Sequence, residues 1–169
     1  MTEYDYGLHG FITITPALSA ADHEYLTRFC GTRHMTRRGL DPKYGIDGAF
    51  FVPTTKEDEL LGVDLDNGDH NTPPKMQPSL HCCWEPTADG TRLVWNGIEK
   101  IQRDAEWLTY MEDTLMGGHY TLSGEIVGRR DGCLYTLKKV DGEWDYVPRE
   151  PDEEEQIILA AGPRKIGLV

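Results

Sequence analysis

The sequence lacks any long hydrophobic run. Its longest apolar stretch near the C-terminal end covers only residues 157–161, whereas a membrane-spanning helix needs about 20 consecutive apolar residues. The first residues are acidic, where a secretory signal would be basic and then apolar. The sequence therefore predicts a cytoplasmic protein with no membrane partner.

Cysteine is scarce as well. The four cysteines among 169 residues include no Cys-x-x-Cys pair, which predicts free thiols in a reducing compartment and no disulfide framework. Two pairs, His81 with Cys83 and Cys30 with His34, carry ligand types that suit zinc. Buried thiols that pack as small hydrophobic groups explain them better. We predict no structural metal and no cofactor.

Short catalytic motifs are also missing. The sequence contains no Gly-x-Ser-x-Gly elbow, no Gly-x-x-x-x-Gly-Lys phosphate loop, no His-Glu-x-x-His and no Gly-x-Gly-x-x-Gly, so no catalytic residue is predicted. The acids at 64–69 surround a glycine as in a calcium loop, but their spacing fails the helix-loop-helix pattern. We interpret them as a solvated acidic loop.

Basic residues are outnumbered. Lys and Arg total 17 against 29 acids, a net charge of −12, and such a field repels nucleic acid and anionic lipid at long range. Direct nucleic-acid binding is therefore not expected. One local basic run is an exception, and arginine forks bind phosphate bidentately. The candidate residues for a small anionic ligand are Arg33, His34, Arg37 and Arg38; the alternative is a solvated basic face.

Residues 8–15 have the period-two pattern of a strand, which Pro16 ends. Ser19 is a typical helix N-cap with Asp22 in the first turn, and helical spacing of apolar residues continues from there to Gly31. The strand pattern is Leu8, Gly10, Ile12 and Ile14 alternating with His9, Phe11, Thr13 and Thr15.

Regular patterning returns after an irregular insertion at 41–78, in which residues 49–52 are a candidate edge strand. We predict hairpin strands at 79–85 and 91–95 around a turn at 87–90, a helix at 101–115 closed by Gly117 and Gly118, and strands at 120–127, 133–140 and 143–147. Residues 148–169 form an acidic segment and tail.

This order of elements predicts one α+β domain over residues 1–169. Its core matches the β-α-β-β-α-β order of ferredoxin-like folds, with an antiparallel sheet, both helices on one face and an extra C-terminal strand. Trp84 and Trp95 come from the two hairpin strands. An exposed tryptophan on a sheet is a typical binding anchor, so both are candidate ligand-binding residues; the alternative is that they pack the core.

Several short motifs lie between residues 78 and 127. They are Pro-Ser-Leu-His-Cys-Cys-Trp-Glu-Pro-Thr at 78–87 with Asp89-Gly90, Trp-Asn-Gly at 95–97 with Glu99-Lys100, Glu-Trp-Leu at 106–108 and Leu-Ser-Gly-Glu at 122–125. In this order they resemble a family of small phage and prophage proteins. That family has no established activity, so the resemblance implies a phage context and carries over no catalytic role. The chain departs from the family pattern at 101–102 and 128–132.

Three hypotheses follow. The first is a non-enzymatic, phage-type binding protein that sequesters a small phosphate-bearing immune signal, such as a nucleotide, as a counter-defence protein, with the site at the interface of a homo-oligomer. The second is an acidic protein–protein inhibitor or nucleic-acid mimic that binds a host protein. The third is a nucleotide hydrolase.

Overall fold

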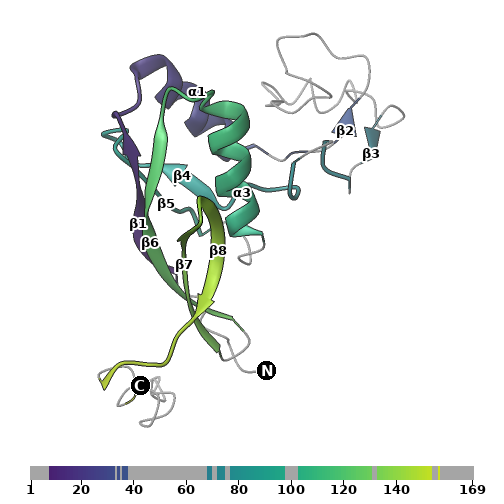
Figure 1. The fold of residues 1–169 in the computed structure, drawn as a ribbon. Helices are drawn as coiled ribbons and strands as arrows, with labels where there is room; N and C mark the ends of the chain where they lie inside the picture. Colours follow the sequence, from purple (N-terminus) through teal and green to yellow (C-terminus); the bar gives the residue numbers. More distant parts are fainter. Residues whose placement is uncertain are drawn as a thin grey trace, which may run out of the picture.

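A computed structural model describes residues 8–32, 34, 36–37, 68–69, 72–74, 77–97, 103–130, 133–153 and 156. These residues form an α+β fold with a six-stranded sheet in the order β4-β5-β1-β6-β7-β8, antiparallel throughout (Figure 1). The predicted α+β class and antiparallel sheet are confirmed. The strands are β1 (Leu8–Thr15), β4 (Trp84–Pro86), β5 (Arg92–Trp95), β6 (Thr121–Arg130), β7 (Cys133–Val140) and β8 (Glu143–Pro148).

A separate two-stranded sheet joins β2 (Thr36–Arg37) to β3 (Gly68–Asp69). The candidate edge strand at 49–52, most of the 41–78 insertion and the tail after residue 156 lie outside the described residues. None of the helices in the described ranges has the length and apolar character needed to span a bilayer.

Helix α1 (Ala20–Cys30) begins as predicted. The Ser19 hydroxyl accepts a hydrogen bond from the backbone N–H of Asp22 at 3.1 Å, which satisfies one of the free donors of the first turn. The Asp22 carboxylate also accepts from the Tyr120 hydroxyl at 2.5 Å. The Ser19 hydroxyl donates to the same carboxylate at 2.6 Å. The bonds from Ser19 and Tyr120 to this carboxylate lower the pKa of Asp22, and the bond from Tyr120 fixes the start of α1 to the residue that precedes β6.

The helix predicted at 101–115 is divided. Helix α3 (Asp104–Tyr110) continues directly into the π-helix η3 (Met111–Leu115). Arg103 has a φ of 57°, a left-handed conformation that cannot continue a helix, so α3 starts at Asp104. Gly117 and Gly118 end the segment with positive φ angles, which confirms the predicted glycine stop.

The hairpin β4–β5 has the predicted turn but a shorter first strand. The strand expected at 79–85 is reduced to Trp84–Pro86, because the Ser79 hydroxyl donates to the carbonyl of His81 at 2.9 Å and bends the chain locally. In the turn, the Asp89 carboxylate accepts from the hydroxyls of Thr87 and Thr91, at 2.6 and 2.8 Å.

The core lies on one side of the main sheet. Alternate residues of the strands point into a single apolar cluster, where they meet Phe29 of α1 and Trp107 of α3, whose ring centroids are 6.1 Å apart. Figure 1 shows the two helices next to each other at the upper end of the sheet. The main strand residues in the cluster are Ile12, Ile14, Leu93, Leu122, Ile126 and Leu137.

A glycine makes room for part of this core. Gly128 of β6 is directly opposite Tyr135 of β7, and a Cβ added at Gly128 would lie 2.5 Å from the tyrosine ring. Real Cβ atoms do not approach other atoms so closely, so the absence of a side chain at Gly128 is what lets the Tyr135 ring cover the strand. The Tyr135 hydroxyl can then reach the carboxylate of Asp104 at 3.4 Å.

Candidate functional site

The predicted basic site is only partly within the described residues. Arg33 and Arg38 lie outside them, and of Arg37 only the backbone is described, paired with Gly68. His34 is described, and its side chain is 0% exposed. Its ring lies 4.3 Å from the Phe29 ring, and Nε2 is 3.0 Å from the Phe29 carbonyl. His34 is therefore placed in the core and not on the surface that the basic run was expected to form.

The two candidate tryptophans lie directly opposite each other in the β4–β5 ladder, so they share one side of the sheet. Trp84 is 0% exposed, and its Nε1 donates to the carbonyl of Asp104 at 3.1 Å. Trp95 is half-buried against the core. Trp84 therefore packs the core and does not present the exposed stacking surface of the binding hypothesis.

The cysteines do not assemble a metal centre. Cys30, Cys82 and Cys83 are buried, and burial raises the pKa of Cys30 and of Cys83 well above the ordinary thiol value. Thiols held in this protonated form are poor metal ligands and nucleophiles. Within the described ranges, no group of three or more His, Cys, Asp or Glu side chains is positioned to hold a metal ion.

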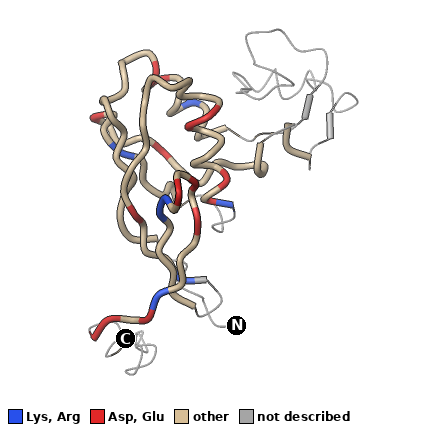
Figure 2. Tube along the Cα trace, viewed as in Figure 1, with Lys and Arg blue, Asp and Glu red and all other residues tan. Residues whose placement is uncertain are grey.

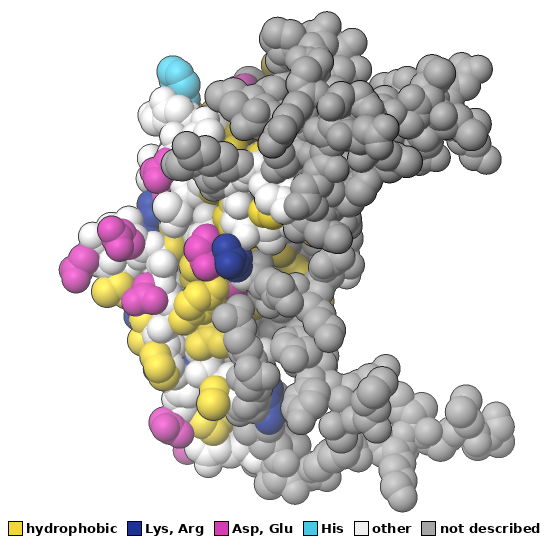
Figure 3. Space-filling model, turned by 90° about the vertical axis from the view of Figure 1, so that its right-hand side faces the viewer, with side chains coloured by type: hydrophobic (Ala, Val, Ile, Leu, Met, Phe, Trp, Pro, Cys, Tyr) yellow, Lys and Arg dark blue, Asp and Glu magenta, His cyan; other side chains and the backbone are white. Residues whose placement is uncertain are grey.

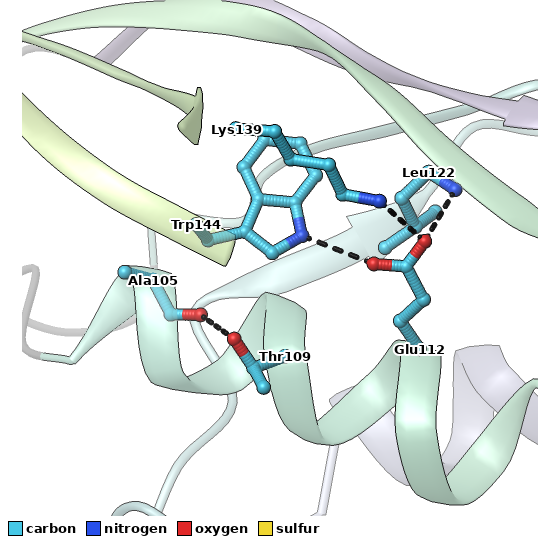
Figure 4. A network of polar contacts seen from close by, with 6 residues as sticks. All are labelled: Ala105, Thr109, Glu112, Leu122, Lys139 and Trp144. Atoms are coloured by element: carbon cyan, nitrogen blue, oxygen red, sulfur yellow. Dashed lines mark hydrogen bonds and ion pairs between the residues drawn. The ribbon is translucent and has the colours of Figure 1, made fainter. Parts of the chain in front are cut away.

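A polar cluster joins the π-helix to three strands. The Glu112 carboxylate accepts from Lys139 Nζ at 2.7 Å, from the backbone N–H of Leu122 at 3.1 Å and from Trp144 Nε1 at 3.2 Å (Figure 4). Both oxygens are therefore occupied by protein donors. This arrangement fixes η3 to β6, β7 and β8 and has a structural role.

A second polar cluster is buried at the start of α3. The carboxylate of Asp104, which is 0% exposed, accepts hydrogen bonds from the hydroxyls of Tyr146 and Tyr135. The Tyr146 hydroxyl also lies 3.2 Å from the backbone N–H of Ala105. Because these groups satisfy one another in the core, a ligand has no direct access to them.

The other side of the main sheet is different. We call it the open face and define it by the outward side chains of β5, β1, β6 and β7: Arg92, Phe11, Thr13, Ser123, Glu125 and Lys138. These six positions alternate with core positions of the same strands, and most are exposed. Buried side chains of α1 and α3 belong to the same apolar cluster as the inward side chains of the strands.

Phe11 and Arg92 form the central feature of the open face. Phe11 is 41% exposed, although it lies on a central strand. The guanidinium carbon of Arg92 lies 4.1 Å from the centroid of the Phe11 ring, which is a cation–π contact. The Arg92 guanidinium makes no ion pair or hydrogen bond with any residue that the structure describes. The charge of Arg92 also helps to lower the pKa of Asp89, but its N–H donors make no hydrogen bond with a described residue and can donate to an anion.

Polar groups surround this pair in a defined register. Thr13 is directly opposite Arg92 on one side and Ser123 on the other, so the Thr13 hydroxyl is next to Arg92 and the Ser123 hydroxyl is one strand further along the same row. Glu125 is directly opposite Phe11. The open face therefore combines a cation, an aromatic ring, hydroxyls and a carboxylate on three adjacent strands.

Charge is distributed unevenly over the described molecule. Figure 2 shows acids interspersed along the strands and helices, with more acids in the segment that follows β8. Figure 3, which shows the molecule from the right-hand side of Figure 1, has hydrophobic side chains gathered in the lower half of the described surface, with acids beside them and only scattered Lys or Arg side chains. The described residues on this side form no broad basic surface.

Sequence reasoning missed Phe11, Arg92 and Glu125. A signal for Phe11 was present, because a large aromatic residue occupies the outward phase of the strand at 8–15. Nothing local marks Arg92 or Glu125. They come near Phe11 only because β5 and β6 pair with the two sides of β1.

Comparisons with protein-family models, with curated proteins and with solved structures find no significant match to this chain.

Proposed function

We propose that this protein is a non-enzymatic binding protein that captures a small phosphate-bearing ligand, such as a nucleotide, on the open face. The observation that carries the proposal is the Arg92 guanidinium stacked 4.1 Å from the ring of an exposed Phe11. The site differs from the basic run predicted at 33–38, while the class of ligand is the same.

The chemistry of the pair supports this ligand class. An arginine that stacks on an aromatic ring is pre-organised, so it loses less conformational entropy when its fork binds a phosphate. Nucleobases stack both on aromatic side chains and on guanidinium planes. The hydroxyls of Thr13 and Ser123 lie in the same row and can hydrogen-bond to phosphate or sugar oxygens.

The biological setting is proposed from the resemblance of residues 78–127 to small phage and prophage proteins. A phage protein that binds a nucleotide without transforming it can act against host defence by lowering the free concentration of a nucleotide signal. Sequestration in the host cytoplasm, across an interface between copies of this chain, is the version of this role that we propose.

The finer topology is also a proposal. The strand order β4-β5-β1-β6 with antiparallel neighbours is the order of a ferredoxin-like unit, in which the two helices cover one face. Contacts between Phe29 of α1 and Trp107 of α3 support a shared helical layer. That layer leaves the opposite face of the sheet for ligand binding.

The test is isothermal titration calorimetry against mono-, di- and cyclic nucleotides, comparing the wild type with Arg92→Met. Loss of a charged hydrogen-bonding partner is expected to weaken binding by at least about tenfold. Arg129→Met is the matched control, because Arg129 is an exposed arginine on the open face of β6 but is remote from Phe11. This variant should bind the nucleotide with the affinity of the wild type. The proposal fails if no nucleotide binds the wild type with a dissociation constant below about 1 mM.

A further inference from the structure

We infer that the open face selects nucleotides whose base carries an exocyclic amine, and that Glu125 is the residue that recognises this amine. This inference rests on the proposed function and adds to it the orientation and the specificity of the ligand. It depends on the positions of three side chains: Arg92, Phe11 and Glu125.

These side chains lie on three adjacent strands. Arg92 is on β5, Phe11 on β1 and Glu125 on β6, and Glu125 is directly opposite Phe11. Arg92 is level with Thr13, two residues along β1 from Phe11. Two strand spacings of about 4.8 Å and a two-residue offset of about 7 Å therefore separate the backbones at Arg92 and Glu125 by roughly 12 Å. The two charges make no ion pair with each other. Phe11 therefore lies between Arg92 and Glu125, and both of these charged side chains are exposed and do not contact each other.

This spacing fits a molecule with two unlike ends. A nucleotide has an anionic phosphate at one end and a planar base with hydrogen-bonding groups at the other. Arg92 attracts the phosphate and Glu125 repels it, so one orientation is favoured, with the phosphate over β5 and the base edge towards β6. The base then lies over the stacked pair formed by Phe11 and Arg92.

The specificity follows from what a carboxylate can do. An ionised carboxylate only accepts hydrogen bonds. Adenine, cytosine and guanine present an exocyclic amine that donates, whereas uracil and thymine present a carbonyl at the position of the cytosine amine, and this carbonyl faces the carboxylate with like partial charge. Glu125 should therefore discriminate between cytosine and uracil, which otherwise have nearly the same size and shape.

Lys138 supports this arrangement from the other side. It is directly opposite Glu125 in the β6–β7 ladder, and Asp145 of β8 is in turn directly opposite Lys138. The lysine balances the charge of Glu125 without making an ion pair with it in the described structure. The Glu125 carboxylate consequently keeps its acceptor sites for a ligand.

The experiment compares CMP with UMP, and AMP with IMP, by calorimetry on the full chain. The wild type should bind the amine-bearing member of each pair at least about tenfold more tightly. In Glu125→Gln the side-chain amide can donate as well as accept, so each preference should fall to within about twofold. Glu143→Gln, which removes an exposed carboxylate of β8, is the matched control and should keep the wild-type preference.

The outcomes separate the two proposals. Equal binding of CMP and UMP by the wild type, with both weakened by Arg92→Met, overturns the role of Glu125 and leaves the proposed function standing. A preference that survives in Glu125→Gln also overturns it. If none of these four nucleotides binds, the role of Glu125 is overturned, and the proposed function falls as well if no di- or cyclic nucleotide binds with a dissociation constant below about 1 mM. Amide NMR spectra of each variant verify the fold, which these exposed substitutions should leave unchanged.

Discussion

The two sides of the main sheet use polar and aromatic residues in opposite ways. On the core side, Trp84 donates to a backbone carbonyl, and the Glu112 carboxylate accepts from three donors. On the open face, the charged groups of Arg92 and Glu125 make no ion pair with any described residue. Arg92 and Glu125 are next in sequence to the core residues Leu93 and Ile126, so β5 and β6 contribute to both sides at alternating positions.

This difference separates stability from binding capacity. Buried polar groups must be paired, because an unpaired one costs about 1–3 kcal/mol. Exposed groups are solvated and have no such requirement, so they remain free to exchange water for a ligand. We therefore expect substitutions on the core side to lower the free energy of unfolding, and substitutions on the open face to affect binding instead.

The largest effect is expected for Trp84→Ala. Trp84 is fully buried and hydrogen-bonded, so truncation should lower the free energy of unfolding by about 3–5 kcal/mol. Phe11→Ala removes an aromatic ring from the other side of the same sheet and should cost less than about 1 kcal/mol. Urea unfolding followed by circular dichroism measures both, and similar losses would contradict the division between the two faces.

The next effect concerns the link between η3 and the strands. Glu112→Gln replaces a carboxylate that accepts from three donors with an amide that has one acceptor oxygen. Because hydrogen bonds to charged groups are worth about 1.5–3 kcal/mol, we expect the free energy of unfolding to fall by about 2 kcal/mol. Solvent screens the ion pair between Lys139 and Glu112, because their side chains are 29% and 21% exposed. The expected loss is therefore near the lower end of the range for hydrogen bonds to charged groups.

The neighbouring residue supplies the control for Glu112. Asp113→Asn removes a carboxylate from an exposed position of the same π-helix, and its effect should stay within about 0.5 kcal/mol. If both substitutions destabilise the protein equally, the loss comes from negative charge on the helix in general. The three contacts of Glu112 would then have no special importance.

Local sequence patterns predicted much of the fold. The period-two strand at 8–15, the Ser19 cap and the glycine stop at 117–118 match the structure, because each depends on a few neighbouring residues. The predicted helix at 101–115 was wrong in its details, since the helix starts at Asp104 and becomes a π-helix at Met111. That change accompanies contacts of Glu112 with three strands, which no local pattern contains.

The candidate site was less predictable than the fold. Trp84 and His34 were chosen for their chemical type, but both are buried, because burial depends on the packing of α1 and α3 against the sheet. Phe11 and Arg92 are 81 positions apart in the sequence, and they meet only through the pairing of β1 with β5. A site assembled by strand order is invisible until the order is known.

A smaller loss of stability is expected for Gly128→Ala. The added Cβ would lie 2.5 Å from the Tyr135 ring and 2.8 Å from Leu8, so the core must shift, at a cost of about 1–2 kcal/mol. Gly31→Ala is the control, because its Cβ would be no closer than 3.5 Å to another atom. Thermal unfolding should show a lower midpoint for the first variant alone; equal midpoints would mean that Tyr135 moves away without cost.

Asp89 is an exposed residue that nevertheless accepts three hydrogen bonds within the protein, all at Oδ1. The hydroxyls of Thr87 and Thr91 and the backbone N–H of Thr91 lower the pKa of Asp89 to about 2. A carboxyl whose pKa is lower in the folded than in the unfolded state stabilises the fold above its unfolded value, and this stabilisation is lost as the pH falls from about 4 towards 2. Asp89 should therefore contribute a small acid sensitivity that comes from an exposed turn.

The measurement is an NMR titration of the Asp89 carboxyl in the wild type and in Thr87→Val, which removes the hydroxyl with the largest effect on this pKa. The pKa should rise towards the ordinary aspartate value in the variant. If it stays near 2, as in the wild type, the Thr87 hydroxyl is not its cause. A rise would show that hydrogen bonding within the protein, and not burial, sets the stabilising contribution of this exposed carboxylate.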